Sequence, residues 1–303
     1  MSDDYLWDRT GEVDPEVARL EGLLAEHRYR GEPPRGRSAG WGRGPWLLAA
    51  LVLLGVGVGV ALRSMRSDTA SWGLSSASCA DCSLAVGEWL EPSEPTRLQV
   101  ADIGHLDVAA SSRLRIVATG VDEHRVELER GSLHAMVLAP PRLLVVETPA
   151  ATAVDLGCEY DLEMGADGAG RLTVTSGWVA LEGPLGTTTV VEGSWAPMRT
   201  GHPPGLPRFL SASQAFSEAA DLAETDPAAA LDPLLRLARR ADTLTLFHLL
   251  PRVDGPDRER VLAEIERLGP GRIDRALDRD GVLALDADAL EALLGVLVGC
   301  CAR

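Results

Sequence analysis

Two cysteines form a Cys-x-x-Cys motif, Cys79-Ala80-Asp81-Cys82. Thiols at this spacing can form a local disulfide, supply half of a zinc site or act as a redox couple. A zinc site needs further ligands, and the next candidate, His105, stands alone; a thioredoxin-type motif needs a surrounding βαβ pattern, which this sequence lacks. We therefore predict a disulfide between Cys79 and Cys82, with free thiols and redox or metal sensing as alternatives.

The other residues that could do chemistry form no known catalytic pattern. The sequence has no HExxH, no GxSxG and no isolated pair of carboxylates in an apolar stretch. Its six histidines are scattered along the chain: His27, His105, His124, His134, His202 and His248. We predict a protein that is not an enzyme and that has no catalytic residues, no metal and no cofactor.

Charge is distributed unevenly along the 303 residues. The chain has 45 acidic residues against 29 basic ones, all arginine, and its net charge of −16 makes a nucleic-acid partner unfavourable. Acidic residues dominate 1–26, arginines dominate 27–45, no charge occurs in 46–62, and 63–303 is acidic again. This order suggests a tail, a membrane span and a large body beyond it.

The uncharged segment 46–62 is predicted to be a single transmembrane helix. At 1.5 Å per residue it would rise about 25 Å, near the lower limit for a bilayer core. Neither Gly55 nor Gly57 in this segment begins the G-x-G-x-x-G spacing of a dinucleotide site. Five arginines precede the segment and two follow it, which predicts that the N-terminus lies in the cytoplasm and the body on the opposite side of the membrane. A buried segment of a soluble domain is the alternative.

The cytoplasmic tail, residues 1–45, contains a predicted amphipathic helix. Asp14 and Pro15 supply a helix start, and apolar residues follow at helical spacing. So short a segment cannot bury its own apolar side chains, which suits docking into a partner; an unstructured tail is the alternative. The candidate partner-binding residues are Tyr5, Leu6, Trp7, Val17, Leu20 and Leu24.

Beyond the span, the pattern divides the body into three parts. Residues 63–95 are predicted to be a stalk that carries the Cys-x-x-Cys motif. Residues 96–200 alternate apolar with polar side chains between Gly and Pro turns, which is typical of an all-β sandwich, roll or solenoid. Residues 208–303 return to helical periodicity and predict a small helical domain. The expected helices are 211–224, 227–240, 243–250, 257–268 and 286–298.

Three runs in the β region resemble the FecR-like domain: ERGSLHAMV (129–137), VVETPAATAVDLGCEYDLE (145–163) and TVTSGWVALE (173–182). Cys158 departs from the family, which usually has Thr at this place. Gly131, Gly157 and Gly177 are expected to serve the scaffold, at positive φ or at close backbone approaches. The tail run DYLWDRTGEVDPEVARLE in turn resembles the region ahead of a single membrane span in bacterial anti-sigma-factor-like proteins.

These resemblances imply a periplasmic, mostly β signalling module of a transmembrane regulator in the bacterial inner (plasma) membrane, with the N-terminus in the cytoplasm. Regulators of this family control an extracytoplasmic-function sigma factor, and in iron-uptake versions their outer partner is the signalling domain of a TonB-dependent receptor. The leading hypothesis is thus a single-pass signal transducer whose tail binds a sigma factor and whose outer domain senses an outer-membrane receptor or another envelope protein. The alternative is an envelope structural, ligand-binding or protein-binding protein with no sigma-factor partner.

Overall fold

The computed structural model describes residues 71–76, 82–269 and 278–301. The chain divides into two units, residues 1–66 and 67–303, and every described residue belongs to the second. The predicted tail (1–45) and transmembrane helix (46–62) lie outside the described residues. Among the helices that are described, none is long and apolar enough to cross a membrane.

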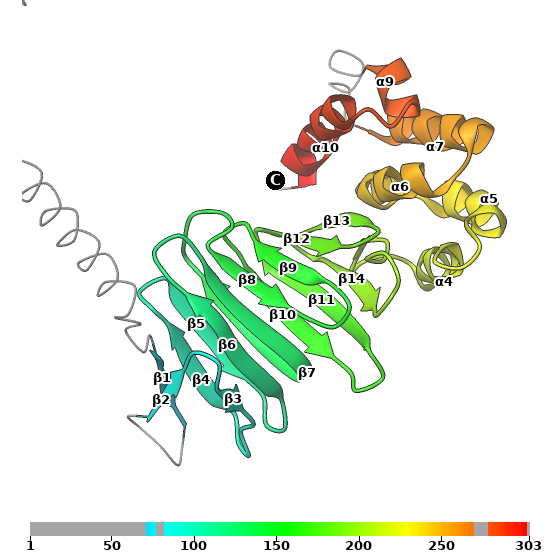
Figure 1. Cartoon of the computed structure of the whole chain (residues 1–303). Helices are drawn as coiled ribbons and strands as arrows, with labels where there is room; N and C mark the ends of the chain where they lie inside the picture. The colour runs from blue at the N-terminus through cyan, green and yellow to red at the C-terminus, as the bar shows by residue number, and fades with distance from the viewer. Residues whose placement is uncertain (1–70, 77–81, 270–277, 302–303) are drawn as a thin grey trace, which may run out of the picture. The chain divides into compact units, whose positions relative to one another are not determined.

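Short strands fill the chain from residue 71 to residue 209 (Figure 1). They are β1 (Ser71–Ser75), β2 (Cys82–Ala85), β3 (Trp89–Leu90), β4 (Thr96–Val100), β5 (Gly104–Val108), β6 (Arg113–Thr119), β7 (His124–Val137), β8 (Leu144–Glu147), β9 (Thr152–Asp155), β10 (Glu159–Met164), β11 (Ala169–Ser176), β12 (Trp178–Gly183), β13 (Gly186–Val191), β14 (Ser194–Arg199) and β15 (Arg208–Phe209).

The strands form two layers that share β7. In the first layer the order is β2-β1-β4-β5-β7-β10-β11-β14-β15, and in the second it is β3-β6-β7-β8-β9-β12-β13. The first half of β7 pairs with β6 and β8, and its second half pairs with β5 and β10. The predicted all-β domain is therefore a two-layer sandwich.

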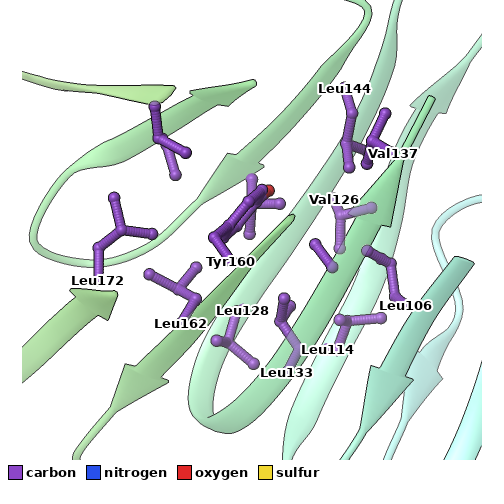
Figure 2. Close-up of a cluster of buried hydrophobic side chains, with 14 of the residues drawn as sticks. Leu106, Leu114, Val126, Leu128, Leu133, Val137, Leu144, Tyr160, Leu162 and Leu172 are labelled. Atoms are coloured by element: carbon purple, nitrogen blue, oxygen red, sulfur yellow. The ribbon is translucent and has the colours of Figure 1, made fainter. Parts of the chain in front are cut away.

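One hydrophobic core lies between the two layers. Alternate residues of each strand point inward, so that Leu106 and Leu162 of the first layer are fully buried together with Leu114 and Leu144 of the second. Figure 2 shows these side chains pointing into the same space. Burial of this apolar area is the main force that holds the layers together.

The sheet begins earlier than the alternating pattern predicted, because β1, β2 and β3 lie within the segment interpreted as a stalk (63–95). β1 pairs with β4 through Leu74 and Leu98, and Trp72 and Leu84 are buried in the sandwich core. These strands have two to five residues, too few for an alternation to stand out from Ser-rich and Gly-rich surroundings.

Helices follow the last strand, close to the predicted positions. They are α4 (Gln214–Ala223), α5 (Pro227–Leu237), α6 (Thr243–Leu249), α7 (Gly255–Leu268), α9 (Arg279–Leu283) and α10 (Ala287–Cys301), with 3-10 turns η2 (Arg240–Asp242) and η3 (Leu250–Arg252). α5 begins where the helix over 227–240 was expected: Asp226 caps it by accepting from the amide of Ala229, with Pro227 in the first turn. Leu293 and Leu297 of α10 complete a second core formed by these helices.

Candidate functional site

The sequence-predicted partner-binding residues, Tyr5, Leu6, Trp7, Val17, Leu20 and Leu24, all lie outside the described residues, so the prediction for the tail stays a prediction. Cys82 begins β2 and is disulfide-bonded. Its predicted partner, Cys79, also lies outside the described residues, so the pairing of Cys79 with Cys82 likewise remains a prediction.

The first of the three FecR-like runs forms the corner at which β7 passes from one layer to the other. Gly131 has φ +100°, and a Cβ there would lie 2.3 Å from Oγ of Ser112. Ser112 fixes the corner from the adjacent loop: its Oγ donates to the carbonyl of Ser132 (3.1 Å) and accepts from the amide of Ser132 (3.0 Å). Glycine is required here both for its backbone conformation and for the close approach of Ser112.

The second and third runs meet at another close approach. Gly157 and Gly177 have φ +91° and +75°, and a Cβ on Gly177 would lie 2.4 Å from the carbonyl oxygen of Gly157. The scaffold role predicted for Gly131, Gly157 and Gly177 is therefore confirmed. Within each of the three FecR-like runs, the chain passes from one layer of the sandwich to the other.

A buried polar cluster lies beside Gly157. The carboxyl of Asp155 accepts from the thiol of Cys158 and from the amide of Gly157 (3.2 Å), and Asp155 is fully buried. Burial raises the pKa of the Asp155 carboxyl, of the Cys158 thiol and of the Tyr160 hydroxyl. A thiol that is buried and kept in its protonated form is a poor nucleophile, so Cys158 acts here as a packed side chain that donates to Asp155.

The edge of the second layer meets the helices at His248. β13 is the last strand of that layer, and its amide at Thr189 points away from the sheet and donates to Nε2 of His248 on α6 (3.1 Å). His248 is 7% exposed, and burial, reinforced by the nearby charge of Arg252, lowers its pKa to about 3. His248 is therefore neutral, as an acceptor must be, and the helices cover the open edge of the sandwich.

A buried arginine joins the same junction from the first layer. Arg208 of β15 has no exposed surface; its Nη1 donates to Oδ1 of Asp221 (2.7 Å) and to the carbonyl of Ser217 (2.9 Å) on α4. Its guanidinium lies 4.5 Å from the ring centre of Trp195, and that of Arg171 lies 4.1 Å from the same ring. Both guanidinium groups lie over the Trp195 ring, and these cation–π contacts stabilise the outer face of β11 and β14 beside α4.

The histidines of the sandwich do not form a metal site in the described residues. His134 lies between Asp161 (2.9 Å) and Glu159 (3.3 Å) on the outer face of the first layer, and His105 lies 3.7 Å from Asp107. Across residues 71–76, 82–269 and 278–301, no group of three His, Cys, Asp or Glu side chains is arranged to hold a metal ion.

With this geometry in place, comparison with known proteins points to one family. The model of the FecR protein family matches residues 90–180, from the end of β3 to the middle of β12. The chain carries a FecR-like domain. The match contains all three sequence runs except the last two residues of the third, and it ends before the helices begin.

Solved structures add little to this assignment. Two crystal structures of a candidate anti-sigma factor from Parabacteroides distasonis are each 17% identical over 40% of this chain, with a TM-score of 0.36. The aligned part spans 59% of that protein. No curated protein matches the chain.

Sequence reasoning missed the junction between the FecR-like domain and the helices. His248 is only one of six scattered histidines in the sequence, and its partner Thr189 lies 59 residues away, so no local pattern connects the two. Arg208 gave one usable signal: it is a charged residue that follows a Pro-rich linker and precedes a helix start. No local pattern indicates that such an arginine is buried.

Proposed function

We propose that this protein is a single-pass inner-membrane regulator of an extracytoplasmic-function sigma factor. Its FecR-like domain, helped by the helices that cover its edge, acts as a periplasmic sensor. Its tail, residues 1–45, binds the sigma factor in the cytoplasm, and residues 46–62 connect the two across the membrane. The sensor's partner is an outer-membrane receptor or another envelope protein. No step in this role requires catalysis or a cofactor.

The observation that carries the proposal is the FecR family match on the sandwich. The order of the chain supports it: an acidic tail with apolar residues at helical spacing, an arginine-rich flank, an uncharged stretch of membrane length and then the FecR-like domain. β1 begins at Ser71, so eight residues, 63–70, separate the FecR-like domain from the proposed span.

Signal transfer requires two states that the outer partner and the sigma factor stabilise differently. The junction between the sandwich and the helices is suited to such a change. It holds a small apolar cluster of its own, Val191, Leu244 and Val298, separate from the two main cores. Specific polar contacts at His248 and Arg208 complete it. Small, partly polar interfaces of this kind can open without unfolding either part.

Topology is the first test of the proposal. A periplasm-active reporter fused after residue 70 should be active, and the same reporter fused after residue 40 should be inactive. A cytoplasm-active reporter should give the opposite result at the two positions. The inverse pattern would place the FecR-like domain in the sigma factor's own compartment and end the proposal. The envelope-binding alternative shares this topology, and only the presence of a sigma-factor partner separates the two.

A further inference from the structure

A cavity of about 340 Å³ lies between the outer face of β11 and β14, the linker that follows them, and the C-terminal end of α4. Its floor is the linker laid on β14: the amide of Gly205 donates to the carbonyl of Pro197 (2.8 Å), and a Cβ on Gly205 would lie 2.5 Å from the Pro197 ring. The volume is within the range of small-molecule sites, which often lie where two structural parts meet.

The walls of this cavity carry opposite charges. On the β14 side lies Arg199, which is exposed and makes no ion pair within the described part of the chain. On the α4 side lie Asp221 and Glu224. The rings of Pro197 and Pro203 add apolar surface to the lining of the cavity.

The two acidic side chains differ in whether a carboxylate oxygen is still free to accept a hydrogen bond from a ligand. Both oxygens of Glu224 are used, because Oε1 accepts from the amide of Leu206 (2.6 Å) and Oε2 from Nη1 of Arg252 (2.6 Å). Asp221 accepts from Arg208 through Oδ1, and its side chain remains 66% exposed. Its second oxygen, Oδ2, is therefore open to the solvent in the cavity. The buried Arg208 holds the Asp221 carboxylate in place through Oδ1.

We propose that this cavity binds a small zwitterion with free amino and carboxyl groups, an α-amino acid or a short peptide. Arg199 binds the carboxylate with a charge-assisted hydrogen-bond pair, Asp221 Oδ2 accepts from the ammonium group, and Pro197 and Pro203 contact the side chain. Groups of opposite charge lining one cavity match this ligand class and disfavour molecules of a single charge. That such a ligand would serve as a signal rests on the proposed function; its binding does not.

Isothermal titration calorimetry on the full chain tests the proposal with defined probes. Leucine, Ala-Leu and Ala-Ala-Leu establish the preferred length, and the N-acetyl and C-terminal amide derivatives of the compound that binds most tightly each remove one terminal charge. We expect at least one of the three unblocked compounds to bind and both of its blocked derivatives to bind at least tenfold more weakly, since each loses a charge-assisted contact. Absence of binding by all three unblocked compounds at 10 mM, or equal binding of the tightest compound and its blocked derivatives, would overturn it.

Variants assign the contacts to named residues. Arg199→Gln should weaken binding at least tenfold, and Asp221→Asn should do the same while keeping an oxygen for Arg208. Arg236→Gln is the matched control, because Arg236 is an exposed arginine on α5 outside the cavity. Thermal unfolding of each variant without ligand shows whether it is folded. Wild-type affinity in folded Arg199→Gln and Asp221→Asn would refute the site, whatever the outcome for a sigma factor.

Discussion

At the scale of single residues, the FecR-like domain depends on glycines that hold its corners. Gly177 combines positive φ with a contact that leaves no room for a Cβ, whereas Gly201, with φ +79°, has nothing within 4 Å of where a Cβ would be. The two positions therefore separate the cost of a left-handed backbone from the cost of a steric clash.

We predict that Gly201→Ala lowers the free energy of unfolding by about 1 kcal/mol, the cost of placing a side chain at positive φ. Gly177→Ala should lower it by about 3 kcal/mol or more, because the Cβ would also collide with the backbone of Gly157. Urea denaturation of both variants measures the difference. Equal losses would show that the close approach of Gly177 to Gly157 does not constrain the fold.

His248 gives the stability a pH dependence whose sign follows from its lowered pKa. The folded state keeps His248 neutral down to about pH 3, whereas in the unfolded chain it binds a proton near its ordinary value of about 6.5. Between these values the unfolded state binds more protons, so the contribution is complete above about pH 6.5 and is lost as the pH falls toward 3.

We predict that lowering the pH from 7 to 5 costs wild type about 2 kcal/mol more than it costs His248→Gln, as measured by urea denaturation at each pH. Glutamine does not titrate, and its side-chain oxygen can accept from the amide of Thr189. The subtraction removes every other titrating group, since both proteins share them. The same pH response in both proteins would mean that His248 is not held in its neutral form.

At the scale of elements, the helices protect the open edge of the sandwich, which is strand β13. β13 has the sequence GTTTVV, without a charge or a proline, so it lacks the usual protection of an exposed edge strand. The helices supply that protection. Leu244 of α6 is 1% exposed and packs with Val191 of β13 in the small junction cluster.

We predict that Leu244→Ala costs about 2 to 3 kcal/mol and loosens the cover on β13. Hydrogen exchange at the Thr189 amide, which donates to His248, should then be faster in Leu244→Ala than in wild type. Amides inside the sheet should change less. Leu237→Ala is the control, because Leu237 is 36% exposed on α5 and its truncation should cost much less. Unchanged protection at Thr189 in Leu244→Ala would show that the cluster does not hold the junction closed.

Local chemistry explains which elements the sequence could predict. Residues that are neighbours in the sequence determine the start of α5 at Asp226 and Pro227 and the alternation of β6 and β11. The structure contains both features. The continuity of β7 across two layers is not local: its corner depends on Ser112, nineteen residues before Gly131. The cavity is not local either, because residues of β14, the linker and α4 line it together. The sequence around Arg199 or around Asp221 does not predict it.

At the scale of the whole molecule, the chain combines a FecR-like domain with a tail whose role is proposed. The tail is acidic and holds large apolar side chains that a short segment cannot bury within itself. In protein interfaces, such aromatic anchors contribute most of the binding energy. Trp7 and the helical stripe at Val17, Leu20 and Leu24 are therefore the residues on which a sigma-factor complex would depend.

The most direct test of the central claim is co-purification of a sigma factor with the full chain from its own cells, compared among wild type, Trp7→Ala, the double variant Trp7→Ala with Leu20→Asp, and Arg37→Ala. Wild type and Arg37→Ala should capture a sigma factor equally. Trp7→Ala should weaken capture roughly thirtyfold, for a loss of about 2 kcal/mol, and the double variant should abolish it with membrane insertion intact. Failure of the wild-type chain to capture any sigma factor, or equal capture by the double variant, would contradict the account.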